Sequence, residues 1–261
     1  MKDAALRLLA RTGLLRPTYQ AWERARSLGS DDVAADDGLP VPPAGLRVRV
    51  AGTKDGEWFL HGGKLAEESI RAALVRAGSS IEEMGAVFDF GCGCGRVVRR
   101  WQALRARVTG TDLSSEAIAW SRGNLPFARF EVNDLEPPLP FEDESFDLVY
   151  ALSVFTHLTV DLQLRWLEEL GRVLLPGGYL LITIHGDAYL DRLNQEEAGR
   201  FRSGECVVRW SEVAGSNLCT TFHPVPFVHG PLSEGFEIVE IVPRGALGNP
   251  EQDLVLLRKP A

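Results

Sequence analysis

Short apolar runs alternate with amphipathic stretches through the middle of this chain. The apolar runs occupy residues 86–90, 107–111, 128–132, 146–152 and 179–184. Helical periodicity is found at residues 65–77, 97–104 and 114–124, and in a further stretch with Leu162, Trp166 and Leu170. Buried strands that alternate with helices are typical of a parallel sheet covered on both faces. The pattern therefore predicts an α/β fold with a doubly wound, mostly parallel sheet.

The C-terminal part of the chain departs from this alternation. Residues 236–242 and 253–257 have the pattern of two strands with no helix between them. Such strands pair antiparallel, so we expect a seven-stranded sheet with a C-terminal antiparallel strand. About fifty residues, 186–234, separate the fifth strand from the sixth, and this length is too great for a bare loop. We interpret this segment as an inserted cap.

The N-terminal part is expected to form a separate layer. Residues 1–28 have a helical pattern that is broken around Gly13 and Pro17, and residues 29–45 are rich in aspartate and proline, as in a linker. The predicted domains are therefore a helical lid with its linker over 1–45 and the main domain over 46–261. A lid of this kind would close over the site of the main domain.

Composition narrows the choice of compartment and partner. The 261 residues are 45% hydrophobic and 25% charged, with a net charge of -8, which suits a globular protein and disfavours a nucleic-acid partner. No apolar run approaches ~20 residues, so stable membrane insertion is not expected. Cys92 and Cys94 lack the spacing of a metal site, so we expect no metal and a reducing cytoplasm. The oligomeric state stays open.

The most informative motif follows the first predicted strand. Asp89 ends that strand, and Gly91, Gly93 and Gly95 come directly after it. Glycines at such a turn let the backbone approach a ligand and adopt positive φ. A dinucleotide fingerprint requires glycine at position 96, where this chain has Arg96.

The run 87–96 resembles motif I of the class I S-adenosylmethionine-dependent methyltransferases. Residues 141–150 resemble the family's approach to strand four, residues 170–178 its turn before strand five, and the final two strands its terminal hairpin. The resemblance implies S-adenosylmethionine as cofactor, with acceptors for the ribose after strand two and for the adenine after strand three. It implies these cofactor-binding residues: Asp89, Gly91, Gly93, Gly95, Asp112, Leu113, Asn133, Asp134, Leu135 and Ser153.

Histidines at strand ends are the candidates for a catalytic base. His185 ends the fifth predicted strand and His157 follows the fourth, where open α/β sheets hold their ligands. We place His185 slightly ahead. Hydrogen bonding of His157 to backbone at the start of its helix is the structural alternative.

Four further residues are candidates for substrate contacts: Trp58, Phe59, Asp187 and His223. Core packing is an equal alternative for Trp58 and Phe59, and a surface loop is the alternative for Asp187.

The resemblance implies methyl transfer to an oxygen or nitrogen of a small-molecule acceptor. Residues 151–154 do not match the motif of DNA amino-methyltransferases. Two alternatives are a non-catalytic module that binds S-adenosylmethionine and a nicotinamide-dependent oxidoreductase on a similar fold. Arg96 and the terminal hairpin argue against the oxidoreductase.

Overall fold

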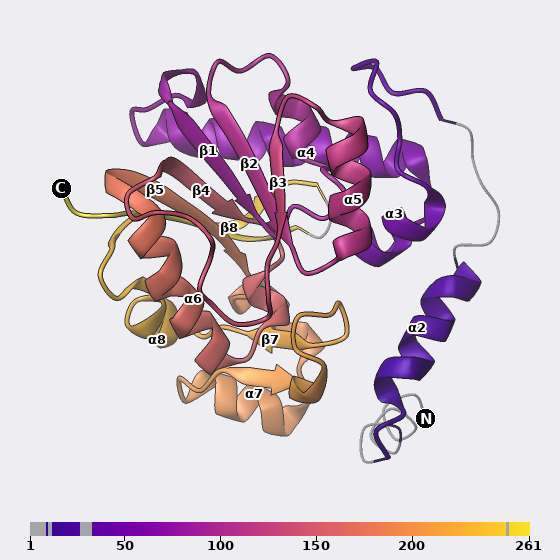
Figure 1. Ribbon diagram of the computed structural model, residues 1–261. Helices are drawn as coiled ribbons and strands as arrows, with labels where there is room; N and C mark the ends of the chain where they lie inside the picture. The colour runs from indigo at the N-terminus through magenta and orange to yellow at the C-terminus, as the bar shows by residue number, and fades with distance from the viewer. Residues whose placement is uncertain (1–8, 10–11, 27–32, 249–250) are drawn as a thin grey trace.

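A computed structural model describes residues 9, 12–26, 33–248 and 251–261 (Figure 1). Its main feature is a seven-stranded sheet in the order β3-β2-β1-β4-β5-β9-β8. The strands are β1 (Ala86–Phe90), β2 (Arg107–Asp112), β3 (Arg129–Val132), β4 (Phe146–Ala151), β5 (Leu174–Ile184), β8 (Glu237–Ala246) and β9 (Gln252–Arg258). Strand β9 runs opposite to the other strands of this sheet and pairs antiparallel with β5 and β8. The predicted doubly wound sheet with its antiparallel C-terminal strand is thus confirmed.

Helices cover both faces of the sheet (Figure 1). The α-helices of the described residues include α2 (Leu15–Arg26), α3 (Ala44–Ala51), α4 (Gly56–Arg76), α5 (Ser115–Asn124), α6 (Val160–Val173), α7 (Gln195–Arg202) and α8 (Val225–Val228). Ile70 of α4 and Ile118 of α5 belong to the core on one face, and Trp166 of α6 belongs to the core on the other. Because the parallel strands β1, β2, β3, β4 and β5 share one direction, their carboxyl ends form a single edge.

Helix α4 begins earlier than the sequence predicted. The Asp55 side chain caps it by accepting a hydrogen bond from the Trp58 amide at 3.0 Å. Trp58 and Phe59 therefore lie in the first turns of α4, ahead of the helical stretch expected over residues 65–77. The Ser114 side chain caps α5 by accepting a hydrogen bond from the Ala117 amide at 3.2 Å.

Two further details correct the sequence analysis. The helix expected over 97–104 is only a short 3₁₀ turn, Val98–Trp101, in which Arg99 and Trp101 bond to separate buried partners. The turn expected at 176–178 lies inside β5. Strand β5 accommodates it as a bulge, since Phe146 and Leu148 of β4 pair with residues 174 and 179.

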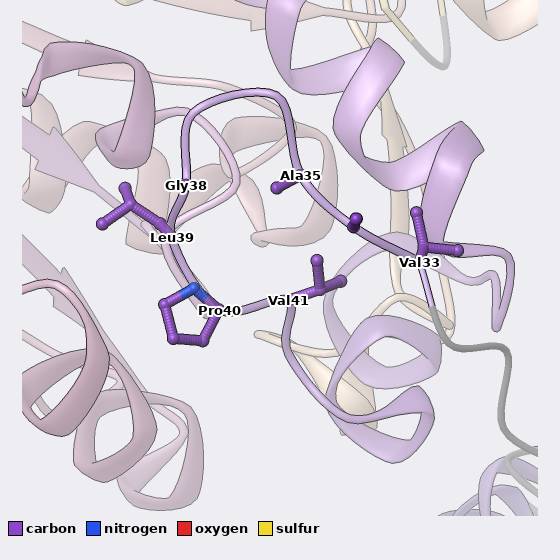
Figure 2. A pocket seen from close by; sticks show the side chains of 7 residues that line it. Val33, Ala35, Gly38, Leu39, Pro40 and Val41 are labelled. Carbon is purple, nitrogen blue, oxygen red and sulfur yellow. The ribbon is translucent and has the colours of Figure 1, made fainter.

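The segment before α3, residues 33–41, is anchored to the main domain. It bends at Gly38 and borders an open, shallow hollow of about 400 Å³ lined by residues 33–35 and 38–41 (Figure 2). Asp37 in this bend forms a buried ion pair with Arg99 at 2.6 Å. Burial alone would raise the pKa of Asp37, but the hydrogen bonds from Arg99 and the Leu39 amide outweigh it and lower the pKa. The predicted boundary at residue 45 falls inside α3.

The segment between β5 and β8 folds into a cap with its own small core. It contains a 3₁₀ segment, Asp187–Arg192, helices α7 and α8, and a two-stranded antiparallel sheet of β6 (Val207–Arg209) and β7 (Thr220–Phe222). Tyr189, Phe201 and Phe222 belong to this core. Figure 1 shows α7 and β7 beyond the carboxyl ends of the parallel strands, where the cap lies against the candidate site.

Candidate functional site

The glycine turn after β1 packs against other segments without room for side chains. Gly91, Gly93 and Gly95 all have positive φ, at 84°, 55° and 73°. A Cβ on Gly91 would collide with Val154 after β4, and one on Gly93 would collide with Val50 of α3. The turn therefore lies between the residues that follow β4 and helix α3 of the N-terminal layer, and it contacts both through its backbone.

Asp112 at the end of β2 holds this turn. One carboxylate oxygen accepts from the Gly93 amide and the other from the Ser114 amide, both at 2.8 Å. Burial raises the pKa of Asp112, whereas these two backbone hydrogen bonds lower it. Each oxygen keeps a further lone pair, so the carboxylate can still accept hydroxyl protons.

Asp89 is a buried carboxyl group beneath the same turn. It is 4% exposed, and burial raises its pKa to about 8, helped by the charge of Asp112. The Tyr150 hydroxyl donates a hydrogen bond to it, which lowers the pKa. Tyr150 in turn accepts from the indole nitrogen of Trp101 at 2.8 Å. This chain of donors fixes where the carboxyl group lies.

Arg96 lies close to Asp89 and was missed as a binding residue. Its Nη1 is buried and has no hydrogen-bond partner among the described residues. Burial lowers the pKa of Arg96, while Asp89 raises it. Gly62 and Gly63 in α4 make room for this side chain, since a Cβ on Gly62 would lie 3.1 Å from Nη1. A glycine pair inside a helical pattern is the signal that could have found it.

Apolar side chains are exposed at the ends of β2 and β3. Leu113 is 41% exposed and Leu135 is 37% exposed. Gly215 of the cap lies over both of them, since a Cβ there would be 2.8 Å from each leucine. Beside them, the buried side-chain oxygen of Asn133 has no hydrogen-bond partner in the described part of the chain. The arrangement offers apolar walls and one free acceptor.

The cap loop of residues 213–219 contacts two other parts of the site. The Gly215 amide donates to the His157 carbonyl at 2.8 Å, and the Asn217 side chain donates to the Arg49 carbonyl in α3 at 2.6 Å. Cys219 accepts from the ring of His157. This segment therefore bridges the N-terminal layer and the turn after β4.

His157 has one ring nitrogen held and one free. Its Nδ1 lies 2.6 Å from the Cys219 carbonyl, which assigns the proton to Nδ1 and leaves the lone pair on Nε2. Nε2 has no hydrogen-bond partner among the residues that the structure describes. Burial lowers the pKa of His157, so the ring is neutral at pH 7. This is the protonation state that a general base requires.

His185, by contrast, has both ring nitrogens engaged. Nδ1 lies 3.2 Å from the Thr221 carbonyl, and Nε2 accepts from the Gln252 amide at 3.2 Å. Burial, followed by the nearby His157, lowers the pKa of His185 to about 3. Gln252 also accepts from the Ser153 hydroxyl at 3.0 Å. Sequence reasoning missed Gln252, which begins β9.

The four candidate substrate residues have different surroundings. Phe59 is fully buried in a core cluster with Leu46 and Cys94. His223 is 1% exposed, donates from Nε2 to the Gln163 side chain at 3.1 Å, and has its pKa lowered to about 3 by burial. Asp187 is exposed, and Trp58 lines a cavity at the start of α4. Of the four, only Asp187 and Trp58 lie where a ligand could reach them.

Cys92, Cys94, Cys206 and Cys219 are free thiols. The described residues contain no cluster of three or more potential metal ligands. Likewise, none of their helices is long and apolar enough to cross a membrane.

The comparisons with known proteins agree with this geometry. Residues 88–182 match the family model described as a methyltransferase domain. The chain is 34% identical over 126 residues to a malonyl-[acyl-carrier protein] O-methyltransferase of Pectobacterium atrosepticum, over 47% of this chain and 46% of that protein. It is 27% identical over 194 residues to the tRNA N(3)-methylcytidine methyltransferase Mettl2 of Drosophila melanogaster, over 70% and 58%. The matched part thus spans only about half of these relatives.

Solved structures share the fold. A SAM-dependent methyltransferase from Methanosarcina mazei has a TM-score of 0.54 at 21% identity, covering 71% of this chain and 97% of that chain. A methyltransferase from Mesorhizobium loti has a TM-score of 0.52 at 21% identity, covering 67% and 90%.

Proposed function

We propose that this chain, which belongs to the class I S-adenosylmethionine-dependent methyltransferases, transfers the methyl group of that cofactor to an oxygen or nitrogen of a small-molecule acceptor. Because the chain belongs to this family, the nicotinamide-dependent oxidoreductase is no longer an alternative. The observation that carries the proposal is the glycine turn held by Asp112 beside the exposed pair Leu113 and Leu135. When bound, S-adenosylmethionine supplies an electrophilic methyl group on a positively charged sulfur.

The residues of the turn fit the nucleoside end of the cofactor. Asp112 accepts from the ribose hydroxyls with the lone pairs that its backbone partners leave free. Leu113 and Leu135 enclose the adenine ring, and the unpartnered oxygen of Asn133, together with Asp134, accepts from its amino group. The backbone around Gly91, Gly93 and Gly95 forms the floor.

The methionine end of the cofactor carries an ammonium and a carboxylate. Asp89 and Arg96 lie next to the glycine turn, and a bound ammonium would favour the ionised form of Asp89, whose pKa burial raises to about 8. We assign the ammonium to Asp89 and the carboxylate to the free Nη1 of Arg96. Ser153, which follows β4 and has φ in the left-handed region at 58°, is assigned to the same end of the cofactor.

His157 takes the role of base in this proposal, and His185 takes a positioning role. The turn that carries His157 lies beside the glycine turn, because Val154 packs against Gly91. Its free Nε2 can accept the proton of a hydroxyl acceptor. His185 has no such free nitrogen, since Gln252 donates to it.

The N-terminal layer forms a cover over the cofactor site in this proposal. Val50 of α3 contacts the glycine turn, and Arg49 pairs with Glu116 of α5 at 2.6 Å. Helix α2 packs against α3, so both helices belong to this cover, whereas residues 1–8, 10–11 and 27–32 of the predicted lid, residues 1–45, lie outside the described residues. The cover would exclude water from the charged sulfur.

A small-molecule acceptor is favoured by the charge of -8, which opposes binding to a phosphate backbone. The names of the relatives include a tRNA methyltransferase and a carrier-protein methyltransferase, so the comparisons do not support the exclusion of nucleic acid. The acceptor is therefore tested across all three classes.

The deciding experiment has two parts. Calorimetry should show binding of S-adenosylhomocysteine and none of NAD. A screen of hydroxyl and amine compounds, tRNA and acyl-carrier protein, with S-adenosylhomocysteine release as the readout, should give turnover with the small molecules. Cofactor binding without turnover on any acceptor would support the non-catalytic module, and turnover on tRNA alone would replace the small-molecule acceptor.

A further inference from the structure

A second hollow opens at the same edge of the sheet. It has a volume of about 500 Å³ and lies between the start of α4, the 3₁₀ segment after β5 and the β8–β9 turn. Its lining residues are Trp58, Ala188, Tyr189, Asp191, Arg192, Arg244, Gly248 and Glu251. None of them belongs to the proposed cofactor site.

The wall of this cavity is continuous with the end of β4. The ring of Tyr189 packs on that of His185, with centroids 4.4 Å apart. His185 accepts from Gln252, which accepts from Ser153. The side chains of His185 and Gln252 therefore link a ligand that contacts Tyr189 to Ser153, which we assign to the methionine end of the cofactor.

The guanidinium groups of two arginines in the cavity are outside any ion pair of the described residues. Neither Arg192 nor Arg244 forms an ion pair within the described part of the chain, whereas Arg200 in the same cap pairs with Glu205. The Arg244 guanidinium donates one long hydrogen bond, to the Ala188 carbonyl at 3.4 Å, and the Arg244 backbone amide donates to the Asp253 carboxylate at 2.9 Å. The Arg192 guanidinium lies 4.5 Å from the centroid of the Tyr189 ring. Stacking on a ring leaves the N–H edge of a guanidinium available to an anion.

We propose that this cavity binds a carboxylate group on a planar methyl acceptor. The inference rests on the proposed function and names its substrate class. Arg192 and Arg244 supply donors whose geometry matches a carboxylate, and Trp58 and Tyr189 supply aromatic surface for the rest of the molecule. Asp191 and Glu251 line the same cavity, and their negative charges disfavour a phosphate dianion relative to a single carboxylate.

The test compares matched pairs of compounds on the full chain. The probes are 4-hydroxybenzoate and 4-aminobenzoate, their two carboxamides, and phenyl phosphate, titrated by calorimetry with saturating S-adenosylhomocysteine. We expect both acids to bind at least ~10-fold more tightly than their amides, and than phenyl phosphate, as expected for loss of a charged hydrogen bond. Arg192→Gln and Arg244→Gln should each remove most of that preference, whereas the control Arg200→Gln should keep it.

The outcomes separate this inference from the proposed function. Equal affinity for acids and amides, no binding of either acid, or an unchanged preference in both arginine variants overturns the carboxylate site. Tighter binding of phenyl phosphate replaces the carboxylate with a phosphate. Affinity for S-adenosylhomocysteine, measured alone on each variant, tests the proposed function and should be unchanged in all three.

Discussion

Replacing His157 with glutamine separates its two possible roles. A glutamine side chain can still donate to the Cys219 carbonyl, so the cap loop keeps its contact while the basic nitrogen is lost. A positioned general base contributes ~10²–10⁴ in rate, which corresponds to about 2.7–5.5 kcal/mol of transition-state stabilisation. We expect His157→Gln to lower kcat by that factor with a hydroxyl acceptor.

His185→Gln is the matched control. Both nitrogens of His185 are already engaged, and its pKa of about 3 makes it a poor proton acceptor at pH 7. This variant should therefore lose less than ~10-fold in kcat, because no base is removed. Its KM for the acceptor should change more than its kcat, because Gln252 and Tyr189 lose their partner.

The pH profile gives an independent readout. Only the neutral ring of His157 accepts a proton, and burial moves its pKa below the usual value of 6.5. The wild-type rate should therefore be flat above pH 6.5 and fall only in more acidic buffer, and the His157→Gln variant should lack that fall. The measurement is release of S-adenosylhomocysteine at saturating substrates between about pH 5 and 9, bracketing the histidine titration.

Two results would refute this reasoning. If His157→Gln binds S-adenosylhomocysteine normally and keeps kcat within ~10-fold, then positioning of the two substrates alone accounts for the rate. If the folded His185→Gln variant loses more than the His157→Gln variant, then the assignment of the two histidines is reversed.

Three further predictions concern the cofactor site and the cap. Asp112→Asn should weaken binding of S-adenosylhomocysteine by about 1.5–3 kcal/mol in calorimetry, since it removes a charged acceptor; unchanged affinity would remove Asp112 from the ribose site. His223 has a folded pKa of about 3, below the unfolded value, so its contribution to stability is present above pH 6.5 and is lost as the pH falls towards 3. Between pH 7 and pH 5 the wild type should lose about 2 kcal/mol more unfolding free energy in urea than His223→Gln, and equal losses would contradict the buried neutral ring. Gly215→Ala places a Cβ 2.8 Å from Leu113 and Leu135 at a φ of 80°. Cofactor affinity should fall by about 1 kcal/mol through backbone strain, and an unchanged value would show that the cap loop does not cover the adenine.

Local patterns in the sequence determined the sheet and the cofactor turn. Alternating apolar runs fixed the strands from β1 to β5, because a strand buried on both faces needs a continuous apolar run. The spacing of Gly91, Gly93 and Gly95 placed the turn, since those positions require positive φ. These features depend on residues that are close together in the sequence, so they can be recognised without knowing which distant segments pack against them.

Only the tertiary structure decided which histidine has a free nitrogen. The partners of His157 and His185 are the carbonyls of Cys219 and Thr221, which lie far along the chain in the cap. The same holds for Arg192 and Arg244, which come together because η4 (Asp187–Arg192) and the end of β8 meet at one edge of the sheet. Periodicity reports which residues are buried, but the packing of distant segments sets which polar atoms lack a partner, and that choice distinguishes a base from a structural ring.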